Sequence, residues 1–104
     1  MHNVYVVKLD DSVADLRKVQ EDNPNRNPSK PCAYVGITGR NPEERFDQHK
    51  RGYKASRYVK KYGVRLMPRL YRRLNPMKYE EAVAMEKELA RRLRKRGYTI
   101  LGGH

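Results

Sequence analysis

The stretch PCAYVGITGRNPEERFDQHKRG, residues 31–52, decides the fold because it combines a strand, a turn and a helix. Its first part, CAYVGIT (32–38), is apolar and contains β-branched residues, which is typical of a largely buried strand. Asn41 then begins a helix, since this capping residue is followed by proline and by acidic residues in the first turn. Gly52 is a typical helix end. The segment therefore predicts a buried strand followed by a short helix.

The predicted helix is too polar to be explained by packing. Phe46 is its one large apolar residue, and one residue cannot form the apolar stripe by which helices pack on a core. Arg45 and His49 are four residues apart and therefore lie on one helix face. A solvated surface position would explain His49 by itself. Arg45 can hold a phosphate with two parallel hydrogen bonds, so we interpret this face as a functional one.

The chain before this segment predicts a second strand and a polar excursion. Residues 3–9 (NVYVVKL) have the composition of a largely buried strand. The excursion covers about residues 10–31: Ser12 is expected to cap a short, weakly amphipathic helix, and residues 23–31 form a turn-rich loop. We expect the two strands to pair antiparallel, with the excursion inserted between them.

The chain after the segment predicts further helices and strands. Ser56 and Gly63 enclose a second short helix, and residues 64–74 (VRLMPRLYRRL) are interpreted as an edge strand because they contain Pro68. A long helix is expected at 78–96. These elements are followed by YTIL (98–101), a last strand or an extended tail.

The order of elements predicts the fold class. Strands that alternate with helices in this way indicate an α+β fold, with a small antiparallel three-stranded sheet flanked by helices. A length of 104 residues allows one domain, 1–104, with a small core.

The charge of the chain indicates its partner. Lysine and arginine number 24 against 12 aspartate and glutamate residues, which gives a net charge of +12. Such a field attracts polyanions, so nucleic acid is the leading partner. No apolar run approaches the roughly 20 residues of a membrane span, so no membrane partner is expected.

The N-terminus and the cysteine content indicate the compartment. The sequence MHNVYVVKLDD lacks the pattern of a secretory signal, and the single Cys32 suits a reducing compartment. We therefore expect a cytoplasmic protein. Three widely spaced histidines and one cysteine argue against a structural zinc site.

Glu86 has an unusual position in the long helix. At about 100° per residue it falls inside the predicted apolar arc. The arc consists of Ala82, Val83, Met85, Leu89, Ala90 and Leu93. A carboxylate there is costly unless it is paired, hydrogen-bonded or bound to a metal. Two interpretations stay open, namely a buried salt bridge, for example to Arg45, and a functional carboxylate.

Two strand tyrosines are also candidates. Tyr5 and Tyr34 each lie in an apolar strand, and packing explains most tyrosines at such positions. A strand tyrosine whose hydroxyl faces a polar cleft could instead position or activate a water molecule.

Taken together, these motifs resemble those of a known family. NVYVV (3–7), YVGIT (34–38) and ERFDQH (44–49), followed by Glu86, resemble the GIY-YIG nucleases, which include homing endonucleases, some restriction enzymes and the incision domain of bacterial excision repair. The resemblance covers nearly the whole chain. The glycine of the first motif is Asn3 here, and the excursion separates two strand motifs that the family usually joins by a short turn.

The resemblance implies roles for single residues. Tyr5 matches the tyrosine implicated as the base that activates water, and Tyr34 matches the one that helps to hold the scissile phosphate. Arg45 would stabilise phosphate charge, and His49 occupies a position that is His or Tyr in the family. Glu86 matches the acid that binds a single divalent metal, Mg²⁺ or Mn²⁺.

Two further positions follow from the same resemblance. Gly36 matches the glycine of the second motif. Family members often have a basic residue shortly after that motif, where this chain has Ile37, and Arg40 is the candidate substitute.

The sequence thus predicts a metal-dependent endonuclease whose substrate is DNA, acting as a monomer or weak dimer. The basic residues expected to bind nucleic acid are Arg40, Arg51, Lys54, Arg57, Lys60 and Lys61. Two alternatives stay open. One is a noncatalytic nucleic-acid-binding module on the same fold, and the other is a basic protein of structured RNA, whose sheet tyrosines would stack on bases.

Overall fold

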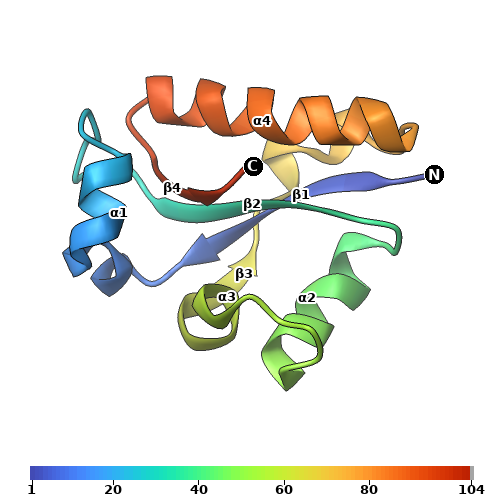
Figure 1. Cartoon of the computed structure of the whole chain (residues 1–104), viewed down its shortest axis with the longest axis horizontal. Coiled ribbons are helices and arrows are strands. Elements are labelled where there is room, and N and C mark those ends of the chain that lie inside the picture. The colour runs from blue at the N-terminus through green and yellow to red at the C-terminus, as the bar shows by residue number, and fades with distance from the viewer. Residues whose placement is uncertain (104) are drawn as a thin grey trace.

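The computed structural model describes residues 1–103, which form an α+β fold around one mixed sheet. The strands are β1 (Asn3–Leu9), β2 (Cys32–Thr38), β3 (Gly63–Leu66) and β4 (Thr99–Gly102), in the spatial order β3-β1-β2-β4. The α-helices are α1 (Arg17–Asp22), α2 (Pro42–Arg51), α3 (Arg57–Tyr62) and α4 (Tyr79–Lys95). Helix α4 covers one face of the sheet, and α2 and α3 lie on the other side (Figure 1). The site described below depends on this two-sided arrangement.

The pairing of β1 with β2 confirms the predicted antiparallel hairpin. The two strands are in continuous register from Asn3 opposite Thr38 to Leu9 opposite Cys32. Residues 10–31 are therefore an insertion that leaves the hairpin intact. Tyr5 lies opposite Gly36 in this register, which places Tyr5 and Gly36 on the same face of the sheet.

The prediction of three antiparallel strands is wrong. The sheet has four strands, and β4 pairs parallel to β2, with Cys32 opposite Thr99 and Val35 opposite Gly102. Residues 99–101 are buried, so they join the core as a strand and not as an exposed tail. A parallel partner needs a crossover connection, and α4 returns the chain to the correct end of the sheet.

The predicted edge strand over 64–74 is also wrong beyond Leu66. Strand β3 ends there, and the chain continues as two 3-10 helices, Pro68–Leu70 and Arg72–Leu74. Pro68 stands at the start of the first of them, a position where the missing N–H of proline costs nothing. Apolar and polar residues alternate loosely over 64–74, but beyond Leu66 this pattern does not correspond to a strand.

The excursion begins differently from the prediction. Asp10, and not Ser12, provides the cap: its Oδ1 accepts a hydrogen bond from the Ser12 backbone N–H at 2.9 Å. The element that follows is a 3-10 helix, Asp11–Asp15, and α1 starts only at Arg17. An acidic residue two positions before an N–H competes well for it, which shifts the start of the helix.

Asn23 attaches the excursion to β4. Its Nδ2 donates to the Ile100 carbonyl at 3.0 Å, and its Oδ1 accepts from the Ile100 N–H at 2.9 Å and from Arg94 Nε at 3.1 Å. The side chain is buried. Asn23 thus satisfies backbone groups on the outer edge of the sheet, which would otherwise be open to pairing with another strand.

The helix boundaries near the candidate site agree with the sequence. Asn41 Oδ1 accepts from the Glu44 N–H at 2.8 Å, and Gly52 ends α2 with a left-handed φ of 86°. Ser56 caps α3, and α4 begins and ends within one residue of the predicted 78–96. Within residues 1–103, no helix has the length and apolar character needed to cross a bilayer.

Candidate active site

Five predicted residues from four elements converge at one place. Tyr5 comes from β1, Tyr34 from β2, Arg45 and His49 from α2, and Glu86 from α4. The Tyr5 and Tyr34 rings lie 6.3 Å apart between centroids, and the Tyr34 and His49 rings 5.9 Å apart. The charges of Arg45 and Glu86 act on both tyrosine hydroxyls. The structure therefore brings together residues separated by up to 81 positions in the sequence, Tyr5 and Glu86 being the extremes.

A buried hydrogen bond joins Tyr5 to His49. The Tyr5 Oη and His49 Nε2 atoms are 2.8 Å apart, and both residues are only 1 % exposed. The other ring nitrogen, Nδ1, accepts a hydrogen bond from the Ser56 backbone N–H at 3.0 Å. Since Nδ1 is the acceptor, neutral His49 carries its proton on Nε2 and donates it to Tyr5 Oη.

His49 is neutral at physiological pH. Burial, and to a lesser extent the positive charge of Arg45, lowers the pKa of His49 from 6.5 to about 4. Protonation at Nδ1 would also destroy the hydrogen bond from Ser56, because two donors would then face each other. His49 is consequently a fixed hydrogen-bond donor to Tyr5.

Burial and nearby charges shift the pKa of each of the two tyrosines in opposite directions. Burial raises the pKa of Tyr5 well above its ordinary value, with a smaller contribution from Tyr34, whereas the charge and hydrogen bonding of Arg45 lower it. Burial also raises the pKa of Tyr34, followed by the Glu86 carboxylate, and Arg45 and a hydrogen bond with Ser56 lower it. Cations near these hydroxyls favour the phenolate and the carboxylate opposes it.

Arg45 connects the site to the loop after α2. Its Nη1 donates to Gln48 Oε1 and to the Tyr53 carbonyl, each at 3.2 Å, and its Nη2 donates to the Lys54 carbonyl at 2.8 Å. These bonds occupy three of the five guanidinium N–H groups. They orient the side chain and leave donors for Tyr5 or for a phosphate oxygen.

Gly36 makes room for the Tyr5 hydroxyl. A Cβ atom on this residue would lie 2.7 Å from Tyr5 Oη and 3.0 Å from Tyr34 Cε1, well inside contact distance. The motif glycine is therefore required here by the close approach of two site tyrosines, and not by a turn, because it lies within β2.

Glu86 lies on the half-buried side of α4. Within its predicted apolar arc, Val83 and Met85 are only half-buried, as is Glu86 itself. The buried members are Ala82, Leu89, Ala90 and Leu93. Glu86 thus lies within the predicted arc, but the arc is only partly buried at this turn of the helix.

The donor set at Glu86 fits a weakly held hard cation. Within residues 1–103 there is no group of three or more His, Cys, Asp or Glu side chains that could enclose a metal ion. Mg²⁺ is commonly held by one or two carboxylates, with water and substrate phosphate completing its shell. Glu86, beside two hydroxyl groups and with one carboxylate, suits such a site and does not suit a closed structural one.

The predicted nucleic-acid-binding residues lie outside this cluster. Arg40 is exposed and pairs with Glu44 at 3.6 Å, so the structure does not bring it to the tyrosines. Arg51 pairs with Asp47 at 2.9 Å, and both are exposed. The remaining predicted residues, Lys54, Arg57, Lys60 and Lys61, are exposed on α3 and the loop before it.

Three of these cations lie over tyrosine rings. Lys54 Nζ is 5.7 Å from the Tyr53 centroid, and Lys61 Nζ is 5.2 Å from that of Tyr62. The Arg57 guanidinium is 5.2 Å from the ring of its neighbour, Tyr58. These contacts interleave positive charge and aromatic surface on one side of the molecule.

Sequence reasoning missed two positioning residues. Ser56 sets the proton position of His49 through its backbone N–H, although the sequence indicated only its role as a helix cap. Asn3, which replaces the glycine of the first motif, donates from Nδ2 to the Arg40 carbonyl at 2.9 Å and so ties the end of the hairpin to the start of α2. Neither contact has a local sequence signal, since both join segments distant along the chain or use backbone atoms.

Comparison with known proteins agrees with this geometry. The family model described as the GIY-YIG catalytic domain matches residues 25–99, which include four of the five clustered residues. No curated protein and no solved structure shows significant similarity to the chain. A match over most of the sequence, together with the cluster of Tyr5, Tyr34, Arg45, His49 and Glu86, leads to one conclusion: the chain belongs to the GIY-YIG catalytic domain family.

Proposed function

We propose that this protein is a metal-dependent endonuclease that hydrolyses phosphodiester bonds in DNA. The observation that carries the proposal is geometric: the rings of Tyr5 and Tyr34 lie 6.3 Å apart, and His49 of α2 lies 2.8 Å from the Tyr5 hydroxyl. The charges of Arg45 and Glu86 also influence the pKa of both tyrosines. Phosphodiester hydrolysis needs an activated water and stabilisation of developing negative charge, and this arrangement offers both.

Each side chain has a distinct task in this proposal. His49 donates to Tyr5 Oη, a bond that offsets part of the rise in the pKa of Tyr5 caused by burial, while the phenolic proton of Tyr5 points away from the imidazole. Tyr5 would accept the proton of the attacking water. Tyr34, which is half-exposed, would donate to a phosphate oxygen, and Arg45 would stabilise the charge that develops there.

Glu86 would hold the divalent cation, Mg²⁺ or Mn²⁺. When bound, such an ion supplies charge stabilisation at the phosphate. Without a bound cation, the negative charge of Glu86 raises the pKa of both tyrosines. A cation held by Glu86 would oppose this effect and make both hydroxyls easier to ionise.

DNA would approach over α2, α3 and the loop between them. The exposed cations of this region and of the preceding loop would contact backbone phosphates. They are Arg40, Arg51, Lys54, Arg57, Lys60 and Lys61.

The test is the nicking of supercoiled plasmid by the parent protein and by Glu86→Gln, with Mg²⁺, with Mn²⁺ and with a chelator. Gln keeps the size of the side chain but is a poor metal ligand, so the variant should fold, bind DNA and lose cleavage by several orders of magnitude. The matched control is Glu80→Gln, also on α4 but exposed in its first turn, which should nick at the parent rate.

Two results would count against the proposal. Nicking at the parent rate by folded Glu86→Gln would remove Glu86 from the mechanism. If Glu86→Gln melts at a lower temperature and its unfolding accounts for the whole loss of activity, Glu86 is the partner in a structural ion pair. Removing one partner of such a pair costs on the order of 3 kcal/mol, because the other charge is left buried.

One observation favours a second candidate, a nucleic-acid-binding module without turnover. Tyr5 is only 1 % exposed, so its hydroxyl is closed to bulk water in this conformation. This candidate predicts binding that is unchanged by chelator and no nicking with either metal. A structured RNA and a branched DNA, added to the same assay, separate the possible substrates.

A further inference from the structure

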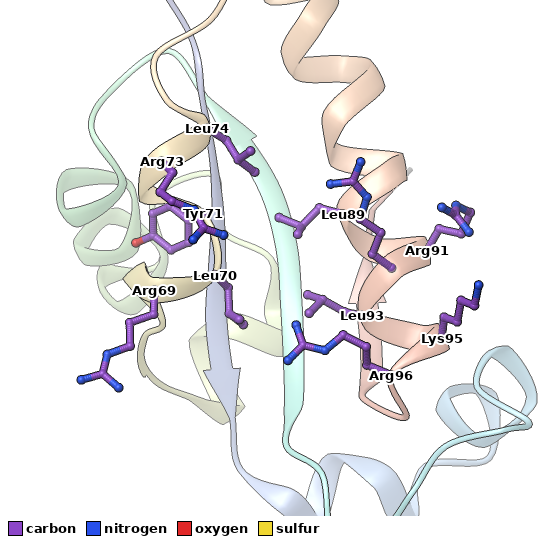
Figure 2. A pocket seen from close by; sticks show the side chains of 11 residues that line it. Arg69, Leu70, Tyr71, Arg73, Leu74, Leu89, Arg91, Leu93, Lys95 and Arg96 are labelled. Carbon is purple, nitrogen blue, oxygen red and sulfur yellow. The ribbon is translucent and has the colours of Figure 1, made fainter.

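A groove lies on the face of the sheet opposite α2. It runs between α4 and the two 3-10 helices Pro68–Leu70 and Arg72–Leu74, above β1 and β2, and has a volume of about 560 Å³ (Figure 2). We call it the α4 groove. Although Glu86 also belongs to α4, the α4 groove is separate from the cluster around Tyr5, because none of the five clustered residues lines it, and α2 lies on the other side of the sheet (Figure 1).

Both walls of the α4 groove are basic. Its lining contains six cationic residues and no acidic one: Arg69, Arg73, Arg91, Arg92, Lys95 and Arg96. Arg69 and Arg73 extend from the 3-10 helices, Arg91, Arg92 and Lys95 from α4, and Arg96 from the position after α4 ends. Arg69, Arg91 and Lys95 point outward at the rims of the groove (Figure 2). Such an arrangement holds positive charge on two sides of one channel.

Part of this charge is not neutralised by the protein. Glu88 pairs with Arg91 at 2.6 Å and with Arg92 at 3.2 Å. By contrast, Arg69, Arg73 and Lys95 take part in no ion pair within residues 1–103 and are exposed. Keeping exposed like charges close together has a cost in free energy, which an anionic ligand would remove.

The floor of the groove argues against an apolar partner. On the α4 side, Leu89 and Leu93 are 5 % and 1 % exposed, so a docking helix could bury little additional apolar surface on them. Leu70 and Leu74, on the side of the 3-10 helices, are half-buried and leave a limited apolar surface there. The large apolar side chains that are exposed lie elsewhere: Met1, Tyr53, Val64 and Tyr79. The groove therefore combines six cations with a modest apolar surface, which suits the phosphate backbone of a nucleic acid better than an apolar helix.

We propose that the α4 groove binds the backbone of a second nucleic-acid segment while the α2 face holds the strand to be cut. This inference rests on the proposed function in one respect, namely that nucleic acid is the partner. The molecule extends 28 Å along its intermediate axis, and along this axis α4 and α2 lie on opposite sides of the sheet (Figure 1). Duplex DNA is stiff over roughly 150 base pairs, so one short straight duplex cannot occupy both faces. The substrate class that fits is a branched or sharply bent nucleic acid, or two neighbouring duplexes.

The experiment compares two triple variants with the same change of charge. The groove variant is Arg69→Glu/Arg73→Glu/Lys95→Glu. The control variant is Arg17→Glu/Lys30→Glu/Lys87→Glu, which replaces exposed cations outside the groove. Two short straight DNA duplexes, one with a donor dye and one with an acceptor dye, are mixed with each protein in the presence of chelator, and energy transfer reports that one protein holds both.

The parent and the control variant should bring the two duplexes together. The groove variant should still bind single duplexes but give no energy transfer. For a four-way junction, log affinity falls as log salt rises. This slope should be less steep for the groove variant than for the parent, by about 3, because three phosphate contacts are lost. Energy transfer equal to that of the control would overturn the proposal, and binding of an acidic protein at this groove would then be the remaining explanation.

Two further measurements distinguish a loss of bridging from effects on folding and on catalysis. All six substituted residues are exposed, and a second groove variant with glutamine at the same three positions should show the same loss of energy transfer at an unchanged melting temperature. Because cleavage is blocked by chelator, bridging without nicking in the metal assay would refute the proposed function only. Nicking by a parent protein that does not bridge would refute the groove proposal only.

Discussion

The hydroxyl of Tyr5 and the imidazole of His49 are joined by a buried hydrogen bond of 2.8 Å that connects β1 to α2. Ser56 determines its direction, because its N–H occupies His49 Nδ1 and leaves the proton on Nε2. His49 therefore donates and Tyr5 accepts. The histidine positions the phenol and favours its ionised form, and it is not available as a base for the phenolic proton.

Replacing Tyr5 by phenylalanine should lower both stability and activity. The substitution leaves the buried Nε2–H of His49 without its acceptor, which costs about 1–3 kcal/mol in the free energy of unfolding. Urea denaturation measures this loss, and nicking at a temperature where the variant is folded measures the loss of activity. The matched control is Tyr71→Phe, at a second buried tyrosine outside the cluster, which should change neither by a comparable amount. Equal stability of the Tyr5→Phe protein and its parent would contradict the hydrogen-bond assignment.

The stability of the protein should depend on pH through His49. Its pKa is about 4 in the folded state and 6.5 when unfolded, so between these values the unfolded chain binds more protons. Stability therefore falls as the pH is lowered from about 6.5 to about 4, by about 3 kcal/mol in total, and this contribution is constant below that window. Urea denaturation across this range tests it. The His49→Gln variant should show a flatter curve, and parallel curves for the two proteins would refute the assignment.

Gly36→Ala should disrupt the site without unfolding the sheet. The added Cβ would lie 2.7 Å from Tyr5 Oη, so the ring must move and its bond to His49 must lengthen. We expect nicking to fall at least about as far as in a single donor deletion, roughly 100-fold. Gly39→Ala is the matched control, because its Cβ would meet only the His2 ring, at 3.4 Å or more. A fully active Gly36→Ala protein would mean that Tyr5 does not need its present position.

Binding of nucleic acid should be governed by salt. If about six phosphates are neutralised, log affinity should fall against log salt with a slope near −5. Lys60→Ala/Lys61→Ala should reduce the magnitude of that slope by about 2, while single-turnover cleavage at saturating protein stays unchanged. Lys30→Ala/Lys87→Ala serves as the control with equal change of charge. A slope near zero for the parent would defeat the polyanion interpretation, and loss of saturated cleavage with intact binding would show that Lys60 or Lys61 belongs to the active site.

The sequence predicted correctly those structural features that depend on residues close together along the chain. The cap at Asn41, the left-handed end at Gly52 and the bounds of α4 depend on hydrogen bonds and periodicity within a few residues, and the structure agrees with all three. The strands at 3–9 and 32–38 are apolar over most of their length, so their burial and pairing could be predicted despite the excursion.

By itself, then, the sequence determined the α+β class, the central hairpin and the set of residues that resembles a family motif. Tertiary structure alone decided the parallel pairing of β4, the attachment of Asn23 to its edge and the direction of the hydrogen bond between Tyr5 and His49. The physical reason is that these features arise from atoms distant along the chain, and in the last case from a backbone N–H. Burial and hydrogen-bond partners of that kind are fixed only when the sheet and helices pack together.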